Sequence, residues 1–287
     1  MMTKNPYLPF IIANIIFGTN GVVASHIPLT SYEIVLCRTI LGGLCLLALA
    51  AGRHEVGELL KHKKLAAWIM VAGGFLAGNW IFLYEAYTQI GVGLATIMCF
   101  SGPILLIILS RFIFGEPFTI PRVAGIILVT IGMFCINGSD VQANGFSWGM
   151  TCGLLAAVCF AFLVIAMKKA QGLPGLIGSA SQLLTAGVIV AVIVVFTHRG
   201  PVNLTPVDMA YIVLLCIVNT GLGYALYLSG VQRLSAQSVS ICCYIEPLAA
   251  LAFSTLFLGE VLTTLQWLGV ILVLGGVAAA ELWHYKG

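Results

Sequence analysis

Charged residues are scarce in this sequence. Asp, Glu, Lys and Arg make up 8% of its 287 residues, whereas 60% are hydrophobic and the mean hydropathy is +1.08. A soluble domain carries about 25% charged residues, so this composition excludes a water-soluble protein and predicts an all-α integral membrane protein in the lipid bilayer. The net charge is only +3 and no basic patch is present, which excludes a nucleic-acid partner.

Residues and motifs for catalysis or metal binding are also missing. The two aspartates are assigned to loops, Asp140 between apolar runs and Asp208 at the edge of one, which excludes an intramembrane aspartyl pair. The sequence lacks G-x-S-x-G, H-E-x-x-H and a phosphate-binding glycine loop. Its nine cysteines have no C-x-x-C spacing, and its five histidines are scattered. We therefore expect no catalytic residue, no metal site and no cofactor.

Long apolar runs, by contrast, fill the sequence. An apolar helix needs about 20 residues to cross the hydrocarbon core of a bilayer, and ten runs of roughly this length follow one another. Each is predicted to form a transmembrane helix, with no soluble domain between them. Their approximate limits are residues 7–25, 31–51, 65–87, 91–114, 119–136, 146–167, 174–197, 206–229, 235–258 and 262–284.

Basic residues are distributed unevenly between the connecting segments. With the N-terminus in the cytoplasm, the inward loops and tails contain eleven of the thirteen Lys and Arg residues, whereas the outward loops contain only Arg199. The positive-inside rule describes this bias. It predicts a multi-pass protein of the cytoplasmic (plasma) membrane with both termini in the cytoplasm. The inward residues are Lys4, Arg53, Lys61, Lys63, Lys64, Arg111, Arg122, Lys168, Lys169, Arg233 and Lys286.

The chain contains one unit twice. Residues 99–119 (CFSGPILLIILSRFIFGEPFT) and 243–263 (CYIEPLAALAFSTLFLGEVLT) align without a gap, at an offset of 144 residues. Each half then holds five spans, and because five is odd, the second half crosses the membrane in the opposite direction. The sequence therefore predicts two inverted five-helix repeats, residues 1–143 and 144–287, a design that many secondary transporters use. Matched positions include Pro103 and Pro247, Gly115-Glu116 and Gly259-Glu260, Gly125 and Gly269, and Gly132 and Gly276.

These motifs carry a family resemblance. The spans that end in FGE and LGE, the following segments GIILVTIG and GVILVLGG, and YEIVLCRTILGG with its Arg38 resemble the drug/metabolite transporter superfamily, EamA type. The resemblance covers the whole chain. It implies ten helices around a central cavity lined by the first four of each repeat, with the fifth and tenth at the periphery or in a homodimer contact, but it implies no substrate. The paired glycines of the fifth and tenth spans suit close helix packing, within the chain or at such a dimer seam.

Polar side chains inside the apolar runs are the candidate site residues. Asn79 and Asn219 lie on corresponding faces of the third span of each half, and Asn14 lies in the first span. An unpaired amide is unfavourable in hydrocarbon, so these side chains are expected to face the bundle interior or water. We interpret them as substrate-binding residues that line a cavity. The alternative is a hydrogen bond between helices.

Arg38 lies about seven residues into the second span, where the other half has Gln182. A cation at that depth is unfavourable unless it reaches the membrane rim or pairs with an anion. Two interpretations stay open. The long side chain extends to interfacial water, or it binds substrate or takes part in gating.

Glu246 lies about eleven residues inside its span, too deep for its side chain to reach either surface. A carboxyl group at that depth is a candidate for proton coupling or cation binding; the alternative is a permanently protonated group that bonds a neighbouring helix. Pro247 removes one backbone hydrogen bond and is expected to free the carbonyl of Cys243. Helical spacing places Glu246 opposite Tyr244, which argues against its place in a cavity that Tyr244 lines, unless Pro247 unwinds the helix locally.

Aromatic residues accompany these polar positions, and we expect them to line the cavity and stack on the substrate. The set is Trp80, Tyr84, Tyr87, Phe100, Tyr224, Tyr227 and Tyr244. For Trp80 and Tyr84 the alternative is an aromatic belt at the membrane interface. Glu85, beside them, is either a second proton-coupling or cation-binding group or an acid that meets water.

Together these features predict a secondary active transporter that works by alternating access and carries a small metabolite. One deep cation, one or two acids, paired amides and several aromatics suit a zwitterion such as an amino acid, and we expect export. The alternative substrate is a cationic, quaternary-ammonium or drug-like compound, moved by a facilitative or proton-coupled carrier. An intramembrane enzyme or a channel is the alternative from another class, and neither explains two inverted halves.

Overall fold

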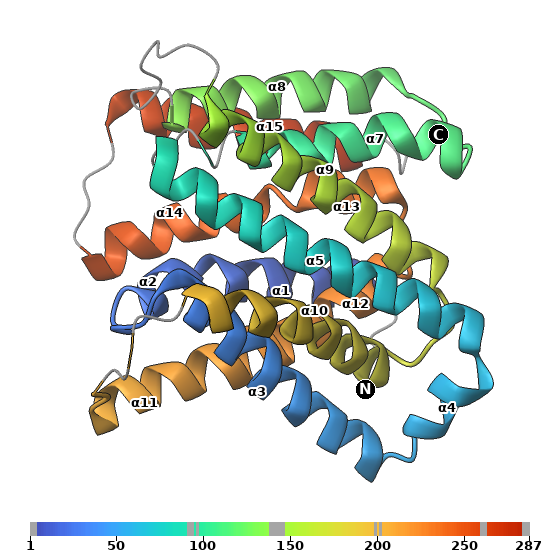
Figure 1. Cartoon of the computed structure of the whole chain (residues 1–287). Helices are drawn as coiled ribbons and strands as arrows, with labels where there is room; N and C mark the ends of the chain where they lie inside the picture. Colours follow the sequence, from blue (N-terminus) through green and yellow to red (C-terminus); the bar gives the residue numbers. More distant parts are fainter. Residues whose placement is uncertain are drawn as a thin grey trace.

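The computed structural model describes residues 5–90, 95, 98–137, 147–197, 200, 203–258 and 263–282. Within these ranges every regular element is a helix, and the helices lie side by side (Figure 1). They are α1 (Tyr7–Gly18), α2 (Asn20–Ala24), α3 (Ser31–Gly52), α4 (Val56–Lys61), α5 (Lys63–Ile90), α7 (Ser101–Ile113), α8 (Ile120–Asn137), α9 (Trp148–Lys169), α10 (Gly175–Thr197), α11 (Pro206–Val213), the π-helix η2 (Leu214–Leu222), α12 (Gly223–Val231), α13 (Ala236–Cys242), α14 (Ile245–Leu258) and α15 (Thr264–Leu282).

The helices agree with the predicted spans. Seven segments are long and apolar enough to cross a membrane, and shorter apolar helices occupy the other three predicted spans. The fold is therefore all-helical and multi-pass, while the count of ten spans stays a prediction. The seven are Tyr7–Ala24, Ser31–Gly52, Lys63–Ile90, Trp148–Lys169, Gly175–Phe196, Pro206–Val231 and Ala236–Phe257; the shorter ones are Ser101–Ile113, Val123–Cys135 and Thr264–Ala280.

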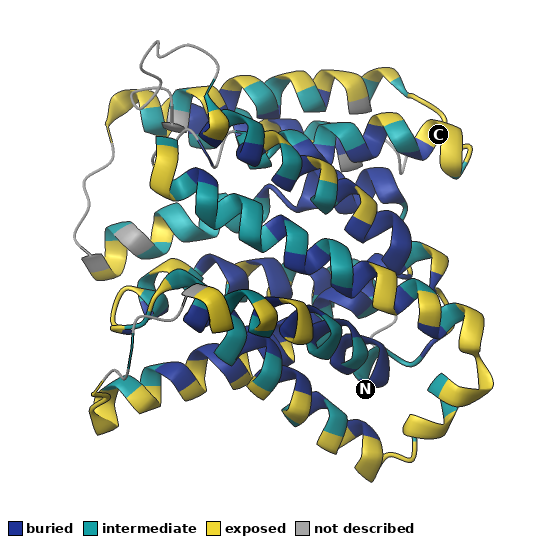
Figure 2. Cartoon of the chain, viewed as in Figure 1, coloured by how far each residue is buried: buried dark blue, intermediate teal, exposed yellow. Residues whose placement is uncertain are grey.

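The outer surface of the bundle is apolar, and its core is central (Figure 2). Phe112, Ile120 and Phe196 are 80%, 87% and 84% exposed on α7, α8 and α10. Soluble proteins rarely expose contiguous apolar surface, whereas hydrocarbon accommodates it. The main buried cluster draws its side chains chiefly from α1, α5, α9, α10 and α12.

Helices α8 and α15, the last helix of each half, pack through glycine. A Cβ atom on Gly125 would lie 2.6 Å from the carbonyl oxygen of Gly276, and one on Gly132 would lie 2.7 Å from that of Gly269. The two helices therefore run antiparallel, with their backbones too close for side chains. In the repeat, Gly125 corresponds to Gly269 and Gly132 to Gly276, so a twofold relation between the halves exchanges the two contacts. The glycine faces of α8 and α15 pack against each other within the chain, so they do not form the dimer contact considered above. The homodimer itself stays a prediction.

Other pairs of helices show the same symmetry, because their counterparts in the other half are also in contact. Helix α5 packs on α9, and α12, the counterpart of α5, packs on α1, the counterpart of α9. Helix α7 also packs on α9, and α14, from the span that corresponds to α7, packs on α1. Helix α3 packs on its own counterpart, α10. Equivalent helices thus have equivalent neighbours, as inverted repeats require. The boundary between residues 143 and 144 lies outside the described residues and stays a prediction.

Basic residues gather at the end of the bundle where α4 lies, because α3 ends there, α5 begins there and α9 ends there with Lys168 and Lys169 (Figure 1). At this basic end Glu116 joins the two halves. Its two carboxylate oxygens accept hydrogen bonds from the backbone amides of Ala236 (2.8 Å) and Gln237 (3.1 Å), at the start of α13. The repeat motif Gly259-Glu260 lies outside the described residues.

We expect Gly276→Ala to lower the melting temperature of the purified protein. The new Cβ would lie 2.7 Å from the carbonyl oxygen of Gly125 and 2.8 Å from the Val129 side chain, so α8 and α15 must separate. Overpacking of this kind costs about 1–3 kcal/mol. Thermal unfolding in detergent measures the effect.

The adjacent Gly275 is the matched control, since a Cβ there has no atom within 4 Å. Gly275→Ala should leave the melting temperature unchanged or raise it, because alanine favours a helix over glycine. Equal melting temperatures for the two variants would contradict the close packing of these helices.

Candidate functional site

Arg38, on α3, points into the bundle. It is 6% exposed. Its Nε donates a hydrogen bond of 2.9 Å to Thr220 Oγ1 on η2, and its guanidinium carbon lies 4.7 Å from the ring centroid of Trp80 on α5. The residue thus joins helices from both halves. Both contacts lie inside the bundle, unlike those of an arginine that extends to interfacial water.

The hydrogen-bond partner of Arg38 lies in a π-helix. Thr220 Oγ1 also donates a hydrogen bond of 2.9 Å to the carbonyl of Leu215, five residues earlier in η2. Turns of this kind occur often at functional sites. Thr220 is completely buried, and its hydroxyl proton is used within η2, so its oxygen is oriented to accept the bond from Arg38.

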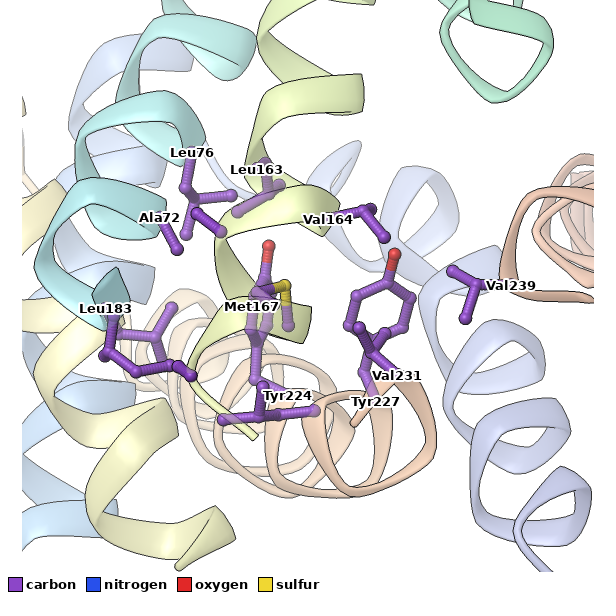
Figure 3. Close-up of a cluster of buried hydrophobic side chains, with 14 of the residues drawn as sticks. Ala72, Leu76, Leu163, Val164, Met167, Leu183, Tyr224, Tyr227, Val231 and Val239 are labelled. Atoms are coloured by element: carbon purple, nitrogen blue, oxygen red, sulfur yellow. The ribbon is translucent and has the colours of Figure 1, made fainter. Parts of the chain in front are cut away.

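Aromatic rings continue from Arg38 across the bundle. Trp80 meets Tyr224 edge to face at 6.0 Å between centroids, Tyr224 lies 6.1 Å from Tyr227, and Tyr227 stacks on Phe10 at 5.0 Å. Figure 3 shows Tyr224 and Tyr227 extending side by side from α12, with their hydroxyl groups away from that helix. Of the predicted aromatic set, Trp80, Tyr224 and Tyr227 therefore belong to one cluster.

Glu246 lies where the ninth predicted span is interrupted. Helix α13 ends at Cys242, and the chain turns through Cys243 and Tyr244 before α14 begins. The backbone amide of Glu246 donates a hydrogen bond of 3.1 Å to the carbonyl of Cys243. The expectation that Pro247 leaves this carbonyl free is therefore wrong, because the tight turn at the break uses it.

Glu246 interacts electrostatically with Arg38. The side chain is half-buried, and electrostatic interactions link it to Arg38, Tyr224 and Tyr227. Glu246 and Tyr244 have different surroundings, as the helical spacing predicts, and the interruption of the helix beside Pro247 goes with an electrostatic interaction between Glu246 and Arg38. Within the described ranges its carboxyl group has no hydrogen bond and no ion pair.

Phe100 and Tyr244 form a separate cluster. The Tyr244 hydroxyl donates a hydrogen bond of 2.8 Å to the Phe100 carbonyl, and the two rings lie 5.6 Å apart. They pack against α8 and α15 and border a mainly apolar cavity of about 140 Å³ beside α7 and α8. The structure does not bring this pair together with Arg38 and Trp80, so the expectation of one shared cavity is wrong for these two rings.

Asn79 and Asn219 connect equivalent helices of the two halves. Asn79 Nδ2 donates to the carbonyl of Ala156 on α9 at 2.8 Å. Asn219 Nδ2 donates to the Ile16 carbonyl at 3.2 Å and to Thr19 Oγ1 at 2.6 Å, both at the end of α1. Both amides thus make the interhelical bonds that stood as the alternative to a cavity lining. Their contact with a substrate stays a prediction.

Asn14, on α1, is completely buried. Its Nδ2 donates a hydrogen bond of 2.7 Å to the carbonyl of Phe10 one turn earlier. Its Oδ1 has no hydrogen-bond donor within the described part of the chain. Asn14 therefore keeps an unused acceptor in the interior.

Tyr84 and Glu85 lie further along α5, and each has contacts of its own with nearby residues. Glu85 accepts hydrogen bonds from Tyr32 at 3.3 Å and from Gln89 at 3.1 Å, and the Tyr84 ring meets Tyr87 edge to face at 5.8 Å. Both residues are partly exposed. No contact joins either of them to Arg38 in the described ranges, and their roles as site residues stay predictions.

Comparison with known proteins extends this description. The sequence profile of the EamA-like transporter family matches the chain twice, over residues 5–138 and 147–280. The chain belongs to the EamA-like transporter family. This result confirms the resemblance drawn from the duplicated motifs, and it identifies the chain as a membrane transporter.

Individual relatives of this EamA-like transporter agree with the family. The uncharacterized transporter YxxF of Bacillus subtilis (strain 168) is 28% identical over 94% of this chain and 88% of its own length. An uncharacterized transporter of Haemophilus influenzae is 25% identical over 89% of this chain and 87% of its own. A protein of known crystal structure, 18% identical, superposes with a TM-score of 0.85 over 99% of both chains, which shows the fold alone.

One contributor to the Arg38 cluster of this EamA-like transporter was missing from the predicted residues, Thr220. Comparison of the repeats does not reveal Thr220, because its counterpart, Leu76, is apolar. A usable signal was present in NTGLGY, where a hydroxyl follows Asn219 inside an apolar run. Tyr224 comes four residues after Thr220, which places both on one helix face.

We expect Thr220→Val to lower the melting temperature of the purified protein. Valine keeps the shape of threonine but leaves the buried Nε of Arg38 without its acceptor. A hydrogen bond to a charged group contributes about 1.5–3 kcal/mol. Thermal unfolding in detergent measures the loss.

Thr39→Val is the matched control on the residue next to Arg38. Thr39 Oγ1 donates only to carbonyls of its own helix, those of Val35 and Leu36. Its replacement should therefore cost less than that of Thr220. An equal loss of melting temperature in both variants would show that the bond from Arg38 to Thr220 stabilises the protein no more than a hydrogen bond within one helix does.

Proposed function

We propose that this EamA-like transporter is a secondary active carrier that exports an amino acid or a similar zwitterion across the cytoplasmic membrane by alternating access. The observation that carries the proposal is the pair Arg38 and Glu246. These residues come from different halves, interact electrostatically, and form no ion pair with each other in the described structure.

Each member of this pair keeps hydrogen-bonding capacity for a ligand. Arg38 uses Nε for Thr220, while its terminal nitrogens have no hydrogen-bond partner among the described residues. A guanidinium end suits a carboxylate, which accepts two parallel hydrogen bonds. The Glu246 carboxylate suits an ammonium group. A molecule with both groups, such as an α-amino acid, would satisfy both residues and keep the site neutral.

A cationic or quaternary-ammonium substrate fits the same residues less well. Such compounds bind over the faces of aromatic rings, but the Arg38 guanidinium already lies 4.7 Å from the Trp80 ring centroid. A second cation beside it would be repelled. Tyr224 and Tyr227 remain as ring surfaces, so this alternative is kept as an outcome of the test below.

The inverted arrangement of the halves supports alternating access. Equivalent helices have equivalent neighbours, so exchange of the two half-conformations would convert access from one side into access from the other. The contacts of Glu116 with α13 at the basic end are bonds between the halves that such a motion would break and remake.

Thermal-shift measurements with the purified protein should identify the cargo class. Each of the standard amino acids is added in turn, and we expect at least one to raise the melting temperature. Its methyl ester, which lacks the carboxylate, and its N-acetyl derivative, which lacks the ammonium group, should each give a much smaller rise. Counterflow of the labelled amino acid in proteoliposomes then distinguishes a carrier from a channel.

Substitution of Arg38 assigns the carboxylate end. Arg38→Gln should lose the discrimination between the amino acid and its ester, whereas Arg53→Gln, at the exposed basic end, should keep it. A larger rise with the ester than with the free amino acid would contradict the zwitterion and favour a cationic substrate.

We expect the basic end to face the cytoplasm. In a cysteine-free background, Lys63→Cys lies at this exposed end and Val207→Cys, 63% exposed, lies at the start of α11 at the opposite end. A membrane-impermeant thiol reagent added to intact cells should label Val207→Cys only. Labelling of Lys63→Cys under these conditions would reverse the orientation.

A further inference from the structure

Helix α1 runs parallel to the α13–α14 segment in a constant register. Near the start of α1, the Tyr7 hydroxyl lies 3.3 Å from Ser238 Oγ. Near its end, Gly18 approaches α14 so closely that a Cβ there would lie 2.5 Å from the Cβ of Ala249. Both pairs are separated by 231 positions in the sequence, so the two segments advance together.

This register brings Asn14 to the level of residues 245 and 246. Asn14 follows Tyr7 by seven residues and precedes Gly18 by four, so all three lie on the face of α1 that meets α13 and α14. The Asn14 side chain is therefore directed toward the interrupted segment that carries Glu246.

Asn14 presents an acceptor there. Its amide nitrogen is identified by the bond of 2.7 Å to the Phe10 carbonyl, because a carbonyl oxygen only accepts. Oδ1 consequently turns away from that bond, is buried, and lacks a donor in the described part of the chain. A buried acceptor without a donor is unfavourable, so this position is suited to receive one.

Glu246 has the same deficiency. No side-chain hydrogen bond involves its carboxyl group in the ranges that the structure describes. An ionised carboxylate only accepts, whereas a protonated one donates a single O–H. Asn14 Oδ1 and an ionised Glu246 carboxylate are thus both hydrogen-bond acceptors, and one added hydrogen-bond donor between them satisfies both.

Arg38 is the one charged side chain that acts electrostatically on Glu246 among the described residues. The other titratable groups are phenols and thiols, which are neutral near pH 7, and α2 contributes none. Proton exchange at this place near neutral pH therefore belongs to Glu246. Those neutral groups are Tyr224 and Tyr227 on α12, Cys99 before α7, Cys242 and Cys243 on its own segment, and Tyr7 on α1.

We propose that Asn14 and Glu246 form a subsite that holds one donor at a time: a proton on Glu246, donated to Asn14 Oδ1, in the empty carrier, and the ammonium group of the cargo in the loaded carrier. The proposal rests on the proposed function for the identity of the cargo. Because both donors occupy the same place, loading releases the proton, and the empty carrier takes one up again. Export of the zwitterion is thereby coupled to inward movement of a proton.

Thermal unfolding at different pH values, without any amino acid, tests the proton-holding state. The melting temperature of the wild type should fall through one transition as pH rises, because only the protonated Glu246 satisfies Asn14. Glu246→Gln should lose this transition, since its amide donates to Asn14 at every pH. Asn14→Leu should move the transition to lower pH, because the proton loses its acceptor.

Glu58→Gln is the matched control, since the Glu58 carboxylate lies on α4 at the exposed basic end, where it pairs with Lys61 at 2.7 Å. It should keep the wild-type pH profile. A transition that persists unchanged in Glu246→Gln, or one that does not move in Asn14→Leu, would overturn the subsite. Asn14→Ala gives the same comparison if the leucine variant does not fold.

Proton release on loading tests the exchange itself. The probe is the amino acid that gives the largest thermal shift, added in weakly buffered detergent at a pH below the transition. The wild type and Glu58→Gln should release protons in proportion to the amino acid bound, and Glu246→Gln should release none. Binding without release in the wild type would overturn the exchange while leaving the transport function intact. If no amino acid binds, the exchange fails together with the proposed function, even where the pH transition is present.

Discussion

The interior of this bundle offers no bulk water, so each buried polar group must find its partner on another part of the chain. The protein meets this constraint largely with bonds between its two halves. Arg38 reaches Thr220 in the second half, and Asn219 reaches back to Thr19 in the first. Asn79 connects α5 to α9 in the same way. The polar bonds that hold the halves together are therefore the same bonds that position the candidate site, and neither half could form that site alone.

Against this background the unsatisfied groups are informative. Asn14 and Glu246 leave acceptors unused at one level of the bundle, while the terminal nitrogens of Arg38 leave donors unused nearby. Donors and acceptors without partners thus occur on residues that interact electrostatically, Arg38 and Glu246. Unmet hydrogen-bonding capacity of opposite kinds is the complement of a ligand that carries both an anionic and a cationic group.

The helices were predictable because the bilayer sets the length of a membrane span. Some of their contacts were predictable because each position of one repeat has a counterpart 144 residues away. The predicted span 7–25 corresponds to Tyr7–Ala24, and the offset of 144 residues pairs Phe100 with Tyr244, which bond each other. The site was less predictable, because side-chain direction depends on helix phase. The π-helix η2 and the break after Cys242 both change that phase, and nothing in the apolar pattern marks either. Glu246 was recognised by its depth alone, whereas its neighbours required the structure.

The two halves share the arrangement of their helices but differ in their charged residues. Arg38 in the first half corresponds to Gln182 in the second, a neutral and completely buried amide whose Oε1 has no donor among the described residues. Two identical halves would make the two access states of such a carrier equivalent by a twofold rotation, with the same free energy. Arg38 and Glu246, whose counterparts are Gln182 and Gly102, remove that equivalence. The resting orientation of the empty carrier, and its response to membrane voltage, would then depend on these two side chains.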